Sequence, residues 1–361
     1  ERGDRAVADE LIVQYVGEET FTVERLPRGK SLRDAEREFE SRPDVAYAEP
    51  NYIAEALFVP NDPYYPVQWH FPKIGMPAAW DVSNGSGVIV AVIDSGVAYE
   101  NYSALGSNYF LAPDLAGTAF VPGYDFVNSD GHPNDDNGHG THVTGTIAQS
   151  TNNALGVSGI AYGASIMPLK VLSKQGSGTY SGIASAIRYA ADNGAKVINL
   201  SLGGTSGATS LESALQYAYQ KGVTIVAAAG NSGSGTVMYP AAYNNYVIAV
   251  GATRYDNTRS WYSSYGSSLD LVAPGGDTTV DQDGDGNFDG ILQQTFQGNN
   301  YGAFDYYYFQ GTSMASPHVA GVAALVIAHG NATTPEDVRT ALQSSADDLG
   351  AFQWIMVHLL K

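Results

Sequence analysis

The sequence lacks cysteine, is poor in basic residues and contains no long hydrophobic run. None of its 361 residues is Cys, which excludes disulfide frameworks, thiol catalysis and zinc–thiolate sites. Lys and Arg together number 18 against 37 Asp and Glu, for a formal net charge of −19. Because such a surface repels phosphate groups and anionic lipids, we expect no nucleic-acid partner and no membrane association. No apolar run reaches the roughly 18 residues that a membrane-spanning helix needs.

Charged residues are concentrated at the N-terminal end of the chain. Residues 1–60 carry 22 of them and residues 61–361 carry 33, a change that predicts two folding units. We expect a first domain at 1–57, a linker at 58–65 and a larger domain at 66–361. In the first domain, the apolar patterns predict a helix and three strands, and hence a small α+β unit: helix 31–41 and strands 10–15, 21–26 and 45–53.

The larger unit alternates apolar, β-branched runs with helical patterns. We expect strands at 88–93, 165–172, 196–202, 223–229 and 246–250. We expect helices at 140–149, 180–193, 210–221, 312–329 and 335–345. Two of these helices are followed by Gly194 and Gly222, where helix-terminating glycines belong. Continuous apolar strands separated by helices predict an α/β fold, a parallel sheet with helices on both faces.

Three side chains in the larger unit have the chemistry of nucleophilic catalysis. Asp94 ends a predicted strand, His139 opens a predicted helix, and Ser313 opens another. Each has an ordinary structural explanation by itself, as a turn residue, a helix-end residue or a helix cap. Together they supply a hydroxyl nucleophile, a base that removes its proton, and a carboxylate that orients the base.

The segments around these residues resemble the subtilisin-like serine proteases, the subtilases. They read VIDSG around Asp94, HGTHVTG from His139 and GTSMASPHVAG around Ser313, and the likeness covers residues 61–348. The resemblance implies a subtilisin-like fold in which Asp94, His139 and Ser313 are the catalytic triad, in the chain order of subtilisin. It also implies that Asn231, at the end of VTIVAAAGN, donates to the oxyanion beside the Ser313 backbone N–H.

The same resemblance assigns residues that contact the substrate. Ser201, Leu202 and Gly203 correspond to the strand that pairs with extended substrate backbone. Ala229 and Gly230, with the alanine before them, are expected to line the opposite wall of the pocket for the residue preceding the cut. These segments carry no charged side chain, so we expect an apolar or aromatic residue there and polypeptides as substrates.

Residues 9–57 resemble the inhibitory prodomain of this family, which is ferredoxin-like. The resemblance implies that the protein's own prodomain helps the protease fold, places its C-terminal tail in the cleft as an intramolecular inhibitor, and is removed by a cut within 54–61. An accessory domain with another role is the alternative. The family likeness further implies a secreted, extracellular monomer. The N-terminus shows no signal peptide, and the opening Glu1 leads us to expect that one has been removed.

One acidic loop has the spacing of a calcium site. Asp281, Asp283 and Asp285 occupy positions 1, 3 and 5 of an EF-hand-type loop with glycine at position 6, and Asp289 occupies position 9. Position 12 is Leu292 instead of the usual glutamate. A solvated acidic loop without an ion is the alternative.

Two further calcium sites are implied by the resemblance alone. One comprises Asp114 with Asn153, and the other comprises Asp125, Asn128 and Asp130. Ordinary loop carboxylates are the alternative for both. We therefore expect Ca²⁺ as the cofactor.

The C-terminal segment departs from the family pattern. Subtilases usually continue after a sequence such as 346–350 into a hairpin rich in Gly and Tyr, whereas residues 351–361 read AFQWIMVHLLK, for which the sequence offers no packing partner. Two rival functions share the fold: a binding protein on an inactive scaffold, and a peptide ligase. The intact triad motifs argue against the first, and the second requires altered residues around the nucleophile that the sequence does not have.

Overall fold

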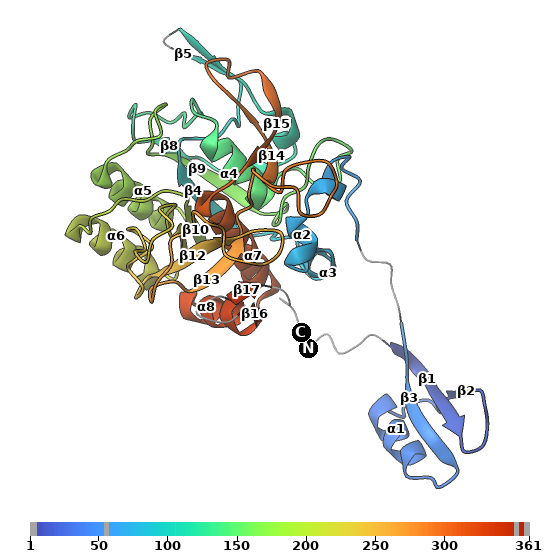
Figure 1. The fold of residues 1–361 in the computed structure, drawn as a ribbon. Coiled ribbons are helices and arrows are strands. Elements are labelled where there is room, and N and C mark those ends of the chain that lie inside the picture. The colour runs from blue at the N-terminus through green and yellow to red at the C-terminus, as the bar shows by residue number, and fades with distance from the viewer. Residues whose placement is uncertain (1–5, 54–57, 105, 350–353, 357–361) are drawn as a thin grey trace. The chain divides into compact units, whose positions relative to one another are not determined.

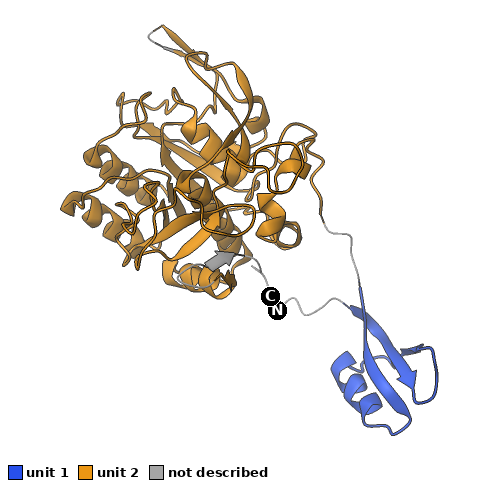
Figure 2. Cartoon of the chain, in the orientation of Figure 1, with its two compact units in different colours: residues 1–57 blue, residues 58–361 orange. Residues whose placement is uncertain are grey.

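The computed structural model describes residues 6–53, 58–104, 106–349 and 354–356. The chain divides into two compact units, Glu1–Leu57 and Phe58–Lys361 (Figure 2). Residues 58–65, expected to be an exposed linker, pack on the larger unit instead. The Phe58 ring lies edge-on to Trp80 at 5.9 Å, and the Tyr64 N–H donates to the carbonyl of Gly156. Packing of the partly buried Phe58 and Tyr65 rings on the core of the larger unit explains the difference. The proline and polar residues of the segment give no sign of this packing in the sequence.

The first unit is a small antiparallel sheet covered by one helix. Its sheet has the order β2-β1-β3, and Leu11, Val13, Ala35 and Ala48 form its core. This confirms the expected α+β class. Its described elements are fewer than those of the β-α-β-β-α-β ferredoxin-like order: β1 (Ala6–Tyr15), β2 (Thr22–Arg25), α1 (Leu32–Glu40) and β3 (Val45–Tyr52).

The larger unit is built on a mostly parallel sheet, as predicted (Figure 1). Its strand order is β16-β17-β13-β12-β11-β10-β4-β9-β7, and β8 also pairs with β9. Only β16 runs antiparallel to its neighbour. The strands are β4 (Ile89–Asp94), β7 (Ala119–Phe120), β8 (Tyr124–Asp125), β9 (Ser165–Lys170), β10 (Val197–Leu200), β11 (Thr224–Ala228), β12 (Val247–Thr253), β13 (Leu271–Pro274), β16 (Ala346–Asp348) and β17 (Trp354–Met356).

Helices cover both faces of this sheet. The alternation of side chains in β4 shows why, since Val90 and Val92 belong to one hydrophobic core and Ala91 and Ile93 to the other. The first core lies under α2 (His70–Lys73), α3 (Met76–Trp80), α4 (His139–Ala148), α7 (Thr312–His329) and α8 (Pro335–Ser344). The second lies under α5 (Tyr180–Asp192) and α6 (Thr209–Gln220).

All ten predicted elements of the larger unit are present, within a few residues at each end. Gly194 and Gly222 have φ of +88° and +81°, as helix-terminating glycines do. The sequence analysis missed the short elements, which are too brief or too polar for a periodic signal: the hairpins β5 (Tyr102–Ala104) with β6 (Ser107–Tyr109) and β14 (Ile291–Phe296) with β15 (Phe304–Phe309), the strands β7, β8, β13, β16 and β17, helices α2 and α3, and the 3-10 turns Tyr65–Val67 and Pro113–Leu115.

Part of the atypical C-terminal segment has a place in the sheet. Residues 354–356 form β17, which runs parallel to β13 with Ile355 opposite Val272. The rest of the segment, residues 351–353 and 357–361, lies outside the described residues. No helix in the described part of the chain is long and apolar enough to cross a membrane.

Three histidines are buried beside α7. His70, His142 and His318 are all 0% exposed. The His318 Nδ1–H donates to the carbonyl of Met314 at 2.7 Å, so His318 Nε2 accepts from His70 Nδ1 at 2.8 Å. Burial lowers the pKa of His142 to about 3 and that of His318 to about 4, and it lowers the pKa of His70 well below its usual value. The folded protein therefore keeps all three rings neutral.

These rings predict a loss of stability in acid. A histidine whose pKa is depressed in the folded state binds its proton only after unfolding, so the free energy of unfolding falls as the pH drops below about 6.5 towards 4. Each such histidine contributes about 1.4 kcal/mol per pH unit in this window. Urea unfolding between pH 7 and 4.5 measures the slope, and His318→Gln should flatten it. A slope that His318→Gln leaves unchanged would contradict this explanation.

Candidate active site

Asp94 and His139 meet at the carboxyl end of β4. His139 Nδ1 lies 2.7 Å from Asp94 Oδ1. The Asp94 side chain is fully buried, whereas that of His139 is 27% exposed, so its other ring nitrogen can face a substrate. The close approach depends on Gly140, because a Cβ there would lie 2.1 Å from the Gly96 carbonyl oxygen. The first turn of α4 can therefore lie directly on the turn that follows β4.

Two opposing effects act on the His139 imidazole. Burial disfavours the charged ring and lowers its pKa, but the negative charge and hydrogen bond of Asp94, with the charge of Asp135 behind it, outweigh burial. The result is a pKa of His139 above its usual value of 6.5. Asp94 also holds the tautomer with the proton on Nδ1, which leaves Nε2 free to accept a proton.

Ser313 is the second residue of α7. It is the one residue of 312–326 that is not fully buried. Its hydroxyl donates to the carbonyl of Ser201 at 3.2 Å, and the Ser201 hydroxyl donates to the carbonyl of Ser313 at 2.8 Å. The Ser313 hydroxyl therefore bonds to the Ser201 carbonyl in this structure. Catalytic hydrogen bonds commonly form only once substrate is bound.

Asn231 is oriented by the residue next to Ser313. Its Oδ1 accepts from both the N–H and the hydroxyl of Thr312, each at 2.9 Å. With the oxygen held in this way, the Nδ2 group remains as a donor at the surface of the cavity beside Ser313. The sequence analysis did not single out Thr312, because a threonine inside the serine motif has no signal of its own.

Two cavities meet at the segment 201–203. One, of about 390 Å³, is lined by Leu202, Gly203, Ala228, Gly230, Asn231, Ser232, Met238, Thr312 and Ser313. The other, of about 380 Å³, contains His139 and is also lined by Ser201, Leu202 and Gly203. Leu202 and Gly203 therefore form a wall common to both cavities. Ala229 does not line either cavity, since its side chain packs into the core beneath α5 and α6.

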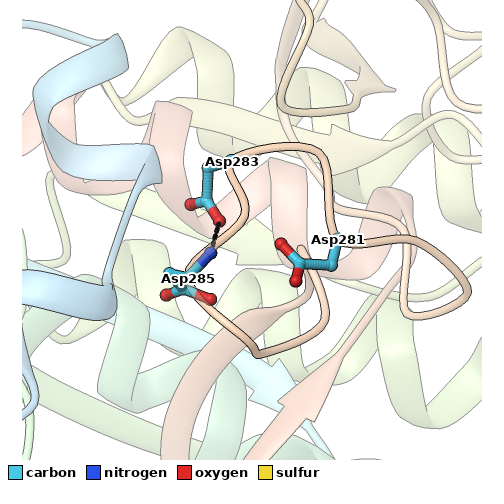
Figure 3. A group of neighbouring side chains, drawn as sticks. All are labelled: Asp281, Asp283 and Asp285. Carbon is cyan, nitrogen blue, oxygen red and sulfur yellow. Dashed lines mark hydrogen bonds between the residues drawn. The ribbon is translucent and has the colours of Figure 1, made fainter.

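The acidic loop brings three of its four predicted carboxylates together. Oxygen atoms of Asp281, Asp283 and Asp285 lie within 4.8 Å of one another, and all three side chains are exposed (Figure 3). Asp289 is buried and accepts from the N–H of Gln282, so it is not part of that group. Burial, followed by the charges of Asp285 and Asp281, raises the pKa of Asp283.

Asp114 and Asn153 also meet, together with a carboxylate that the sequence analysis missed. Asn153 Nδ2 donates to Asp114 Oδ1 at 2.8 Å, and the Asn153 N–H donates to Asp62 at 3.0 Å. Asp114 is buried, which raises its pKa to about 6. Asp62 is also buried and accepts from the Ser158 hydroxyl. It stands in a loop without any local pattern, so only its distant partners identify it.

The third predicted group forms a turn bonded within itself. The Asp125 carboxylate accepts from the N–H of Val127 and from both the backbone and the side-chain N–H of Asn128. Asp130 pairs with Asp125 through the backbone, and its carboxylate accepts from the N–H of His132. Both oxygens of the Asp125 carboxylate are thus occupied by donors of their own loop.

The fold and the site together define a class of enzyme. A buried carboxylate, a half-buried imidazole, a serine at the start of a buried helix and an oriented amide lie at the carboxyl edge of a parallel sheet, which is the composition of a serine hydrolase. The sequence model described as the subtilase family matches residues 85–355.

Similar proteins agree with this class. A thermophilic serine proteinase of Bacillus sp. (strain AK1) is 46% identical over 312 residues, 86% of this chain and 69% of the relative. Thermitase of Thermoactinomyces vulgaris is 43% identical over 293 residues, 81% of this chain and 93% of the relative. Among solved structures, a protease from Pseudoalteromonas arctica PAMC 21717 has a TM-score of 0.71 at 33% identity and covers 82% of this chain and 95% of its own. The chain belongs to the subtilase family and is a serine-type endopeptidase that acts on polypeptides.

The Asp94–His139 contact predicts the titration of His139. Its pKa should exceed 6.5 in the intact protein, and Asp94→Asn should lower it because the attractive charge is lost. NMR of the histidine ring protons against pH measures both values, and His132→Gln serves as a control that removes one imidazole signal elsewhere. A His139 pKa at or below 6.5, or one unaffected by Asp94→Asn, would show that the contact does not act as described.

Proposed function

We propose that this enzyme is a secreted, self-processing subtilase whose catalytic residues are Asp94, His139 and Ser313, with Asn231 in the oxyanion hole. The observation that carries the assignment is the 2.7 Å contact between Asp94 and the Nδ1 atom of His139, at the edge of the sheet where Ser313 begins α7. Homologous secreted subtilisins and thermitase support the setting, and residues 1–57 have the size and α+β class of the prodomain that the sequence resembles.

The proposed mechanism assigns one task to each side chain. Ser313 Oγ attacks the peptide carbonyl while His139 Nε2 takes its proton, and His139 then gives that proton to the leaving amine. Asp94 keeps the proton on His139 Nδ1 and stabilises the imidazolium that forms. The Asn231 Nδ2–H and the Ser313 N–H donate to the oxyanion. Loss of one such donor costs about 2.7–4 kcal/mol of transition-state stabilisation, a figure measured on a subtilisin.

The proposed substrate site follows the segment 201–203. An extended substrate would pair with this segment by backbone hydrogen bonds and place the side chain preceding the cut in the cavity beside Ser313. Leu202, Ala228 and Met238 make the walls of that cavity largely apolar, and none of the residues that line it is charged. We therefore propose an apolar or aromatic residue at that position of the substrate.

Serine-directed labelling tests the nucleophile. A fluorophosphonate should label the wild type, and Ser313→Ala should abolish labelling because it removes the serine that we propose His139 activates. Ser344→Ala, which removes an exposed hydroxyl on α8, is the matched control and should label normally. By intact mass, Ser313→Ala should remain a 361-residue species, whereas the wild type should be cut within 54–61. Labelling that survives Ser313→Ala would overturn the assignment, and identical trimming of both proteins would rule out self-processing.

We also propose calcium as a stabilising ion. Asp281, Asp283 and Asp285 offer three carboxylates close to one another, the hard oxygen donors that Ca²⁺ prefers. Their mutual repulsion favours a bound cation. Asp62, Asp114 and Asn153 would form a second, more buried oxygen site. The ion would neutralise charge in these loops, and no step of peptide hydrolysis depends on it.

Chelation should therefore destabilise the protein without changing the chemistry. A ligand at 100 times its dissociation constant adds about 2.7 kcal/mol, so its removal should lower the thermal midpoint by on the order of 5 °C. Converting Asp281, Asp283 and Asp285 to Asn should reduce this response, while initial peptidase activity stays near that of the wild type. Scanning calorimetry with and without chelator measures the shift.

A second triple variant controls for net charge. Glu212→Gln, Asp305→Asn and Asp347→Asn remove three exposed carboxylates that lie on separate elements. This variant should retain the full response to chelator. If the loop variant responds to chelation as strongly as this control does, the acidic loop is not a calcium site.

A further inference from the structure

Asp135 is a buried carboxylate in the loop that leads into α4. It is 1% exposed, although a carboxylate in such a place is costly unless donors surround it. Five hydrogen bonds reach it, and they come from three backbone N–H groups and two hydroxyls: Asn137 N at 3.0 Å, Gly138 N at 3.0 Å, Thr141 N at 2.9 Å, Thr141 Oγ1 at 2.7 Å and Ser95 Oγ at 2.9 Å. Four of the five belong to the turn that carries His139.

The fifth bond connects this turn to Ser95, the residue after Asp94. The Ser95 hydroxyl donates to Asp135 and accepts from the N–H of Gly140 at 2.9 Å. The Ser95 N–H donates to Asp94 Oδ1 at 2.7 Å. Asp94 Oδ2 has no hydrogen-bond partner in the described part of the chain, so Ser95 and His139 alone orient the Asp94 carboxylate. A single side chain, Asp135, is thus bonded both to the turn that carries His139 and to Ser95, the residue that follows Asp94.

The charged groups around Asp135 come from three elements. Lys170 on β9 is buried, donates to the Ser95 carbonyl at 2.7 Å and pairs with Asp136 at 2.6 Å. Asp94 lies on β4 and His139 on α4. Burial raises the pKa of Asp135, while the hydrogen bonds from Thr141 and Gly138 and the charge of Lys170 act against that rise. All five bonded groups are donors, which is the set that an ionised carboxylate accepts.

We propose that Asp135 is a positioning residue for peptide hydrolysis, which fastens the turn bearing His139 to the turn bearing Asp94 so that the two side chains meet in reactive geometry. The proposal rests on the proposed function of that pair. Asp135 lines neither cavity of the site, so its effect should appear in kcat and not in KM. Its negative charge should also favour the protonated imidazole of His139.

Two variants separate the hydrogen bonds from the charge. Asp135→Asn removes the charge and turns an amide N–H towards other donors, so we expect kcat to fall about 10- to 100-fold. In this variant, the fall of kcat/KM on the acid side of the pH profile (the acid limb) should move to lower pH, together with the pKa of His139 measured by NMR. Ser95→Ala removes only the bridging hydroxyl, so kcat should fall while the acid limb stays near that of the wild type. KM should stay within twofold in both variants.

Asp270→Asn is the matched control for the loss of a buried carboxylate. Asp270 is 9% exposed, accepts from the N–H of Ala249 and precedes β13 at the edge of the sheet opposite Asp94. It should lower the thermal midpoint and leave kcat and the acid limb unchanged. Suppose that fluorophosphonate labels the wild type. If Asp135→Asn and Ser95→Ala then keep the kcat and the acid limb of the wild type, or behave as Asp270→Asn does, the Asp135 proposal fails while the proposed function stands. Failure of the wild type to label would overturn both.

Discussion

Burial of α7 against the parallel sheet is the constraint on which the site depends. The helix can sink into the core because it consists largely of Ala, Val and Gly, and Gly321 lies where a Cβ would come within 2.8 Å of Ile160. Apolar burial of this extent leaves a helix little freedom to shift. Ser313 is therefore presented at a fixed point in the first turn of the helix.

Charge organises the other half of the site. Asp94, Asp135 and Lys170 are buried near the partly exposed His139, and each has specific hydrogen-bond or ion-pair partners because an unpaired buried charge would be too costly. Their net effect favours the protonated imidazole, which suits the proton transfer proposed for His139. The excess negative charge elsewhere lies in exposed loops, such as the one that holds Asp281. Charged residues there can be replaced without disturbing the core.

Different elements were predictable for different reasons. The strand at 223–229 and the helix at 312–329 were evident because apolar residues occupy nearly every position that the core requires. β14 and β15 escaped prediction because polar and aromatic residues alternate irregularly in a hairpin that packs on α4 and not within the main sheet. Residues 58–65 were misjudged because Phe58 and Tyr65 pack their rings on a surface that only the folded larger unit provides.

The sequence by itself determined the chemistry available. Three motifs contain a carboxylate, an imidazole and a hydroxyl, and the likeness of these motifs to the family assigns a role to each group. Tertiary structure decided how those groups are held. Thr312 reaches across to Asn231, Asp62 approaches Asp114 through Asn153, and Asp135 bonds to Ser95, 40 residues earlier in the chain. No local pattern marks such partners, because a hydrogen bond between distant segments depends on the packing of whole elements and not on the residues beside it.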